Sequence, residues 1–208
     1  MMFTRKSRTA VSVSLALIFG ICFQVVSANG ADDTSYETVL RNFLAASPSE
    51  RQEAIARSQE ERAHLEGVML RVAKAGGEPA NSTARRQAIL LLGEIRADST
   101  EVIKFLITNI SLELPGDNLD LSRTTNFPCA TALIRIGGRA PRDIVRYVAE
   151  TAKLPEQQLA LLAEVMREID GADVAGYRVD VVAKAAGWDA ATKERLSQFS
   201  RRVRDEKR

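Results

Sequence analysis

His64 is the only histidine of the 208-residue chain, and it is the first side chain to consider for chemistry. Glu60 and Glu61 lie one helical turn before it, in a spacing that di-metal helical bundles also use. Those bundles need the Glu and His pair twice, with further acidic ligands, and a Ser-His-Asp mechanism needs a serine at a sharp strand-to-helix turn. The sequence offers neither set of partners. We therefore predict no metal site, no cofactor and no catalytic residue, and we expect His64 on a solvated helix face.

Four arginines recur at spacings of 4, 3 and 4 residues: Arg135, Arg139, Arg142 and Arg146. Around a helical turn this spacing can gather guanidinium groups on one rim, where they could bind a carboxylate, a phosphate or an acidic partner. The alternative is a solvated rim neutralised by nearby acids, because exposed charge is the default for such helices.

Residues 111–126 form a stretch that is longer than the roughly 2–8 residues that usually connect packed helices. Leucines and acids alternate around Pro115 and Gly116. Long ordered loops often carry function, and the alternative is a strap whose leucines pin it across the helices. We predict that the loop and the arginine rim form one partner-binding surface, made of Leu112, Leu114, Asp117, Asp120, Arg123, Arg139, Arg142 and Arg146.

The element that must position these residues is a repeat with a constant offset of 41 residues inside residues 84–150. The matched pairs are Ala88 with Cys129, Leu92 with Leu133, Ile95 with Ile136, Ile103 with Ile144, Leu106 with Tyr147 and Ile107 with Val148. Each copy is broken at the same place, at residues 96–99 and at residues 137–141. An apolar helix, a turn and an amphipathic helix that recur every 40–47 residues or so predict stacked helical hairpins.

Both copies are similar to the HEAT-like helical repeat family. The residues that carry this resemblance are Arg86-x-Ala88-x-x-x-Leu92-Gly93-x-Ile95 and Cys129-x-x-x-Leu133-x-x-Ile136-Gly137, followed in turn by Ile103-x-x-Leu106-Ile107 and Ile144-x-x-Tyr147-Val148. The resemblance covers about a third of the chain. It implies a right-handed α-solenoid of about four antiparallel hairpins that binds a protein rather than a small molecule.

The flanking helices fit the repeat period poorly, so we expect degenerate or capping units there. Ser49 and Gln52 are expected to form a capping box. Three later helices carry apolar stripes: Leu159, Leu162, Met166 and Ile169; then Val174, Tyr177, Val181 and Val182; then Leu196, Phe199 and Val203. Sustained alternation typical of strands is absent, which favours an all-α fold. We predict one domain over residues 31–208, with its best repeats at 84–111 and 127–152 and a charged capping helix at 189–208.

The N-terminus has the three-part pattern of a secretory signal peptide. Arg5, Lys6 and Arg8 precede an apolar run over residues 10–26, and Ser27 and Ala28 supply small residues at its end. We predict a cleaved signal over residues 1–30; the alternative is an uncleaved membrane anchor. Those residues hold three basic and no acidic side chains, so the chain without them has 26 basic and 27 acidic residues and a net charge of −1. This balance gives no support for nucleic-acid binding.

Removal of the signal also removes Cys22 and leaves Cys129 as the one cysteine, which excludes an internal disulfide. We expect Cys129 to be a small buried hydrophobe rather than a reactive thiol. Together the patterns favour an exported, periplasmic or extracellular, non-catalytic scaffold for an unidentified protein partner. The alternatives are a membrane-tethered envelope protein and an enzyme that works with two carboxylates in the groove.

Overall fold

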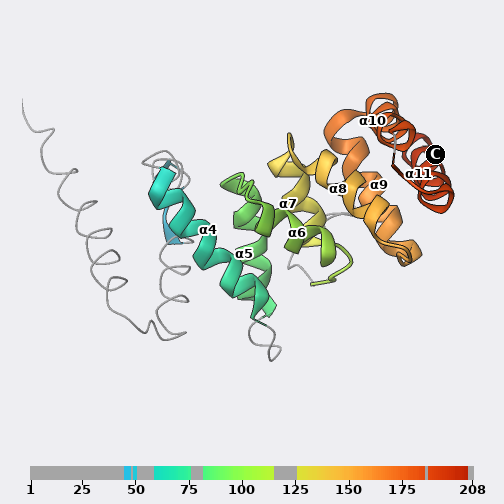
Figure 1. The fold of residues 1–208 in the computed structure, drawn as a ribbon. Helices are drawn as coiled ribbons and strands as arrows, with labels where there is room; N and C mark the ends of the chain where they lie inside the picture. The colour runs from blue at the N-terminus through green and yellow to red at the C-terminus, as the bar shows by residue number, and fades with distance from the viewer. Residues whose placement is uncertain are drawn as a thin grey trace, which may run out of the picture. The chain divides into compact units, whose positions relative to one another are not determined.

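The computed structural model describes residues 45–47, 49–50, 59–75, 82–114, 126–185 and 187–205. The chain divides into two compact units, Met1–Glu53 and Ala54–Arg208. Every regular element of the described residues is a helix, in agreement with the predicted all-α class (Figure 1). No helix among those residues is both long and apolar enough to cross a membrane. The predicted signal segment lies outside the described residues.

In the first unit, Ser47 and Glu50 form a capping box. The backbone N–H of Ser47 donates to Glu50 Oε2 at 2.7 Å, and the backbone N–H of Glu50 donates to Ser47 Oγ at 3.3 Å. These two bonds satisfy donors that a helix start would otherwise leave without partners. They also lower the pKa of the Glu50 carboxyl, with the bond from the Ser47 backbone as the largest cause. This box opens at Ser47, two residues before the predicted Ser49, and Gln52, the predicted partner of Ser49, lies outside the described residues.

In the second unit, the helices among the described residues are α4 Gln59–Lys74, α5 Ser82–Glu94, α6 Thr100–Thr108, α7 Pro128–Ile136, α8 Ala140–Glu150, α9 Glu156–Asp170, α10 Ala172–Lys184 and α11 Ala190–Arg204. Short turns separate α5 from α6, α7 from α8 and α9 from α10, whereas residues 109–127 separate α6 from α7. Helix α5 packs between α4 and α7, and α7 packs against α9. Helix α6 packs against α7 and α8, and α8 packs against α11. The first helices of the two predicted repeats, α5 and α7, thus contact each other, and so do the second helices, α6 and α8.

The turns inside the two predicted repeats have positive φ at equivalent positions, Arg96 (φ 50) and Gly137 (φ 63). After α5, Arg96 N–H donates to Gly93 O and Ala97 N–H donates to Leu92 O, the pair of bonds of a Schellman helix end. Ser99 then caps α6 by accepting from Val102 N–H at 3.3 Å. Both breaks therefore fall where the sequence pattern predicted them.

The core follows the predicted stripes in most helices. The α6 stripe of Ile103, Leu106 and Ile107 is buried, and so is Ile110 just after the helix. Leu196, Phe199 and Val203 of α11 are also buried. Helix α5 is buried on more than one side, because α4 and α7 both cover it. Gly93 lies against the α7 backbone, so that an added Cβ would lie 2.8 Å from Ala132 Cα. Glycine at this position lets the two backbones approach each other.

Most of the predicted apolar stripe of helix α10 is exposed instead of buried in the core. Val174, Tyr177 and Val181 are exposed by 53%, 67% and 49%, whereas Ala175, Gly176 and Val179 are buried. The helix that packs against α10 explains this burial pattern, because α10 packs mainly against α11. The side chain of Arg204 lies over Gly176, where an added Cβ would come within 2.8 Å of Arg204 Cγ. Only the small-residue face of α10 admits that contact, so its larger apolar residues face solvent.

Side chains from neighbouring helices satisfy several helix ends. The amide of Gln158 on α9 donates to Ile107 O and Thr108 O at the end of α6, at 3.2 and 3.3 Å. Arg195 on α11 donates to Val148 O at 2.8 Å and to Ala149 O at 2.5 Å, near the end of α8. The last carbonyls of a helix have no partners within the helix, so these bonds join elements that are far apart in sequence.

Candidate functional site

The predicted arginine rim follows the turn between α7 and α8. Arg135 lies in the last turn of α7, Arg139 precedes α8, and Arg142 and Arg146 lie on α8. All four side chains are exposed. The structure therefore places them along one turn and the helix that follows it.

Arg139 and Arg135 are bound by residues of the preceding predicted repeat. Arg139 donates to Thr100 Oγ1 at 2.8 Å and to the backbone oxygen of Asp98 at 3.3 Å. Arg135 forms an ion pair with Glu94 at 3.4 Å. Both Glu94 with Arg135 and Asp98 with Arg139 are 41 residues apart, which is the offset of the repeat. Equivalent positions of the two copies thus contact each other directly.

Two acids of α8 neutralise more of the rim. Asp143 Oδ2 lies 3.4 Å from Arg139 Nε, a distance that allows charge attraction but not a well-aligned hydrogen bond. Glu150 pairs with Arg146 at 2.7 Å, and its hydrogen bond raises the pKa of that guanidinium. Arg142 is exposed and has neither an ion pair nor a hydrogen bond to the described residues. Of the four arginines, Arg142 is therefore the one whose donors are available without exchange of a partner.

The loop predicted to join this surface is anchored at both ends. Leu114 N–H donates to Asn126 O at 3.2 Å, so the two ends of the loop lie together. The Leu114 side chain is buried, Leu112 is half-buried, and Arg86 donates to Leu114 O. Asp117, Asp120 and Arg123 lie outside the described residues. Of the loop part of the predicted surface, the structure thus describes only the base.

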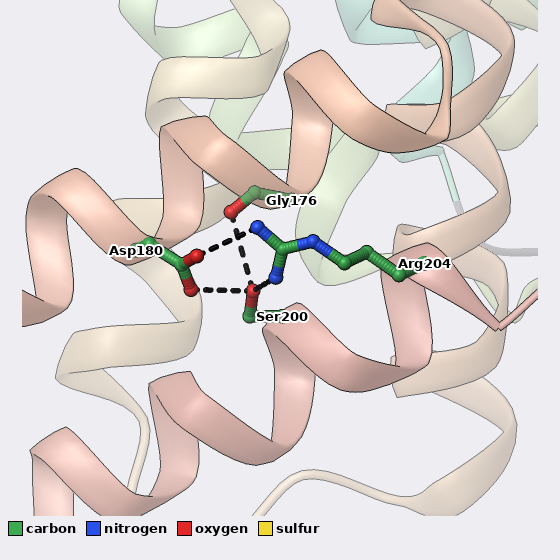
Figure 2. Close-up of polar contacts among 4 residues, drawn as sticks. All are labelled: Gly176, Asp180, Ser200 and Arg204. Atoms are coloured by element: carbon green, nitrogen blue, oxygen red, sulfur yellow. Dashed lines mark hydrogen bonds and ion pairs between the residues drawn. The ribbon is translucent and has the colours of Figure 1, made fainter.

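A polar cluster ties α10 to α11 (Figure 2). Arg204 Nη2 donates to Asp180 Oδ2 at 2.6 Å, and Arg204 also donates to Ser200 Oγ. Ser200 Oγ lies 2.6 Å from Asp180 Oδ1 and 3.2 Å from Gly176 O. Figure 2 shows Asp180 and Arg204 pointing toward one another with Ser200 beside them.

The electrostatics of this cluster fit a structural role. The Arg204 hydrogen bond, and after it that of Ser200, lowers the pKa of the Asp180 carboxyl. A carboxylate with a lowered pKa is a poor general base near neutral pH. Ser200 is only 2% exposed, and its hydroxyl is held by both Arg204 and Asp180. The cluster therefore joins α10 to α11. Sequence spacing did not predict it, because Asp180 lies on one helix and Ser200 and Arg204 lie on another.

Cys129 and His64 are the remaining reactive side chains of the described residues. Cys129 is buried, and that burial raises its pKa to about 12, against a small lowering by Arg85. His64 is exposed on α4. The side chains of Glu60 and Glu61 lie outside the described set, and within that set no group of three or more His, Cys, Asp or Glu residues could hold a metal ion.

The surface that the sequence patterns did not predict is the apolar stripe of α10, formed by Val174, Tyr177 and Val181. They are the exposed large hydrophobic residues of the described part of the chain. Contiguous exposed apolar residues are typical of interaction surfaces. Comparison of the chain with models of protein families, with curated proteins and with solved structures found no match.

Proposed function

We propose that the chain is an exported, non-catalytic interaction scaffold built as a HEAT-like stack of helical hairpins. The observation that carries this proposal is the contact between positions 41 residues apart, Glu94 with Arg135 and Asp98 with Arg139. Repeat stacks form when each unit contacts its neighbour through equivalent positions, and they offer long surfaces for other proteins. The packing of α5 against α7 and of α6 against α8 supports the same arrangement.

The partner surface that we propose joins the base of the loop to the arginine rim. Arg142 is its central donor, because Arg135, Arg139 and Arg146 already have acidic or carbonyl partners. A free guanidinium can form two parallel hydrogen bonds with one carboxylate. The partner would therefore present an acidic side chain to the N-terminal half of α8.

Affinity capture with the full chain as bait tests this proposal on an extract of the cell envelope. The test variant is Arg142→Glu, and the matched control is Lys104→Glu, which reverses the charge of an exposed residue on α6. We expect a saturable, stoichiometric protein partner that the test variant loses and the control retains. A partner retained equally by both variants would remove the rim from the proposal, and the absence of any saturable partner would reject the scaffold.

A further inference from the structure

Helix α10 presents its apolar side to solvent. At about 100° per residue, Val174, Tyr177 and Val181 fall within one narrow sector, opposite the buried Ala175, Gly176 and Val179. Single exposed hydrophobic residues are ordinary on protein surfaces, but a stripe centred on the exposed face of one helix is not. The stripe therefore has the form of one half of a helix-to-helix contact.

The charges beside the stripe indicate what covers it. Asp173 and Lys184 lie on the same edge of the stripe, because they are separated by roughly three helical turns. The acid is at one end and the base at the other, and both are exposed. Arg204 attracts Asp173 and Asp180 attracts Lys184 through charge alone, and neither Asp173 nor Lys184 forms an ion pair with the described residues. On the opposite edge, Arg178 already pairs with Asp170 at 2.8 Å. One edge is thus neutralised internally, and the other carries two opposite charges without ion-pair partners.

We propose that α10 binds α10 of a second copy of this chain, antiparallel about a two-fold axis near Tyr177. A two-fold contact brings the same surface of both copies together. For antiparallel helices, the edge that carries Asp173 meets the same edge of the second copy in reverse order. Asp173 then lies about two residues, or roughly 3 Å along the helix axis, from Lys184 of the second copy, a gap that the long lysine side chain spans. A parallel two-fold pairing would instead bring this edge against the edge that carries Arg178.

The same register covers the apolar stripe. Val174 packs near Val181 of the second copy, and the two Tyr177 rings meet beside the axis with their hydroxyls free to reach water. Three side chains from each copy form a small interface, below the roughly 1,200 Å² of total area that stable complexes reach. The dimer is therefore weak and reversible, and it forms at high local concentration. This self-association is independent of the partner surface on α8.

Sedimentation of the full chain over a range from roughly 1 μM to 1 mM tests the proposal, since weak dimers dissociate within this range. We expect reversible dimerisation that Tyr177→Lys weakens at least about tenfold, because a buried charge replaces a central aromatic contact. The control Gln157→Lys places the same charge at an exposed position of α9 and should leave the dimer unchanged. Unchanged helix content by circular dichroism shows that each variant folds.

Charge exchange tests the register. Asp173→Lys and Lys184→Asp should each weaken the dimer by several-fold, because like charges then face each other twice. Mixed in equal amounts, the two variants should associate with each other more tightly than either does with itself, since both cross-pairs become opposite in sign. Failure of this mixture to associate, a natural chain that stays monomeric at all concentrations, or a dimer insensitive to Tyr177→Lys would each overturn the proposal. So would a different protein that covers Tyr177 while the chain remains monomeric.

Discussion

Cys129 takes the place that Ala88 has in the first predicted repeat, and the fold treats both as small core residues. Its burial raises the pKa to about 12, so the reactive thiolate is scarce at neutral pH. In a Cys22→Ser variant, we predict that the thiol of native Cys129 reacts with a thiol reagent at least about a hundredfold more slowly than after denaturation. An added exposed thiol, Thr108→Cys, supplies the fast reference. Equal rates at the two sites would show that Cys129 is accessible.

Asp180 gives the fold a defined response to acid. Its folded-state pKa is lowered by Arg204 and Ser200, so its contribution to stability is complete above the ordinary aspartate pKa. It is lost as the pH falls through the lowered folded-state value, because the folded protein then has to take up the proton. We predict that Asp180→Asn lowers the free energy of unfolding by about 1 kcal/mol at neutral pH, since the pair is partly exposed.

The measurement for Asp180 is urea unfolding of the natural chain and the variant between neutral pH and roughly pH 3, which spans the ordinary aspartate pKa of about 3.9. The difference between them should shrink toward the acid end. Glu168→Gln, at an exposed position of α9, removes a carboxylate that has no hydrogen bond or ion pair to the described residues, and it should show almost no difference. A difference for Asp180→Asn that is constant over the whole range would contradict the assigned cause.

At the scale of helices, Gly93 sets the distance between α5 and α7. A Cβ there would lie 2.8 Å from the backbone of Ala132, and backbone cannot rotate away as a side chain can. We predict that Gly93→Ala destabilises the protein by about 1–3 kcal/mol, despite the better helix propensity of alanine. Gly67→Ala on α4 has open space around it and should instead stabilise by up to about 1 kcal/mol. Denaturant unfolding of both variants measures these changes in stability. A stabilised Gly93→Ala variant would mean that α5 and α7 can separate freely.

Helix identity could be predicted from the sequence better than helix orientation. The α6 stripe and the breaks at Arg96 and Gly137 depend on local spacing and turn chemistry, and they were predicted correctly. The orientation of α10 was not, because periodicity shows that a helix has two faces but not which face its neighbour covers. There the packing of Arg204 over Gly176 decided the outcome.

For the candidate site, the arginine spacing predicted a shared rim but not its partners. Glu94 and Asp98 are remote in sequence, yet they contact Arg135 and Arg139 across the two predicted repeats. The 41-residue offset contained this information, because equivalent positions of neighbouring repeats are expected to meet. The offset would also have paired Arg142 with Glu101, which instead forms an ion pair with Lys74 at 2.5 Å. The free side chain of Arg142 therefore could not be predicted from the offset.

At the scale of the whole molecule, the net charge depends on whether the predicted signal segment is removed. The three basic residues before Ala10 account for the positive sign of the full chain, which is +2, and the chain without residues 1–30 carries −1. We predict that these basic residues, which precede an apolar run, belong to an export signal rather than to a binding surface. The proposal of an exported scaffold therefore requires that the positive charge leave with the signal.

We predict that the chain recovered after export lacks most or all of residues 1–30 and is weakly acidic, because the segment ends in the small residues Ser27 and Ala28. Intact mass spectrometry of the exported fraction measures both the cleavage position and the loss of Cys22. Leu15→Arg interrupts the apolar run and should keep the full-length chain inside the cell, whereas Leu65→Arg in α4 leaves the signal unaltered and should still permit cleavage. Full-length chain in the membrane fraction would replace the proposal of a released scaffold with that of a tethered one, and the α8 and α10 surfaces would then act close to the membrane.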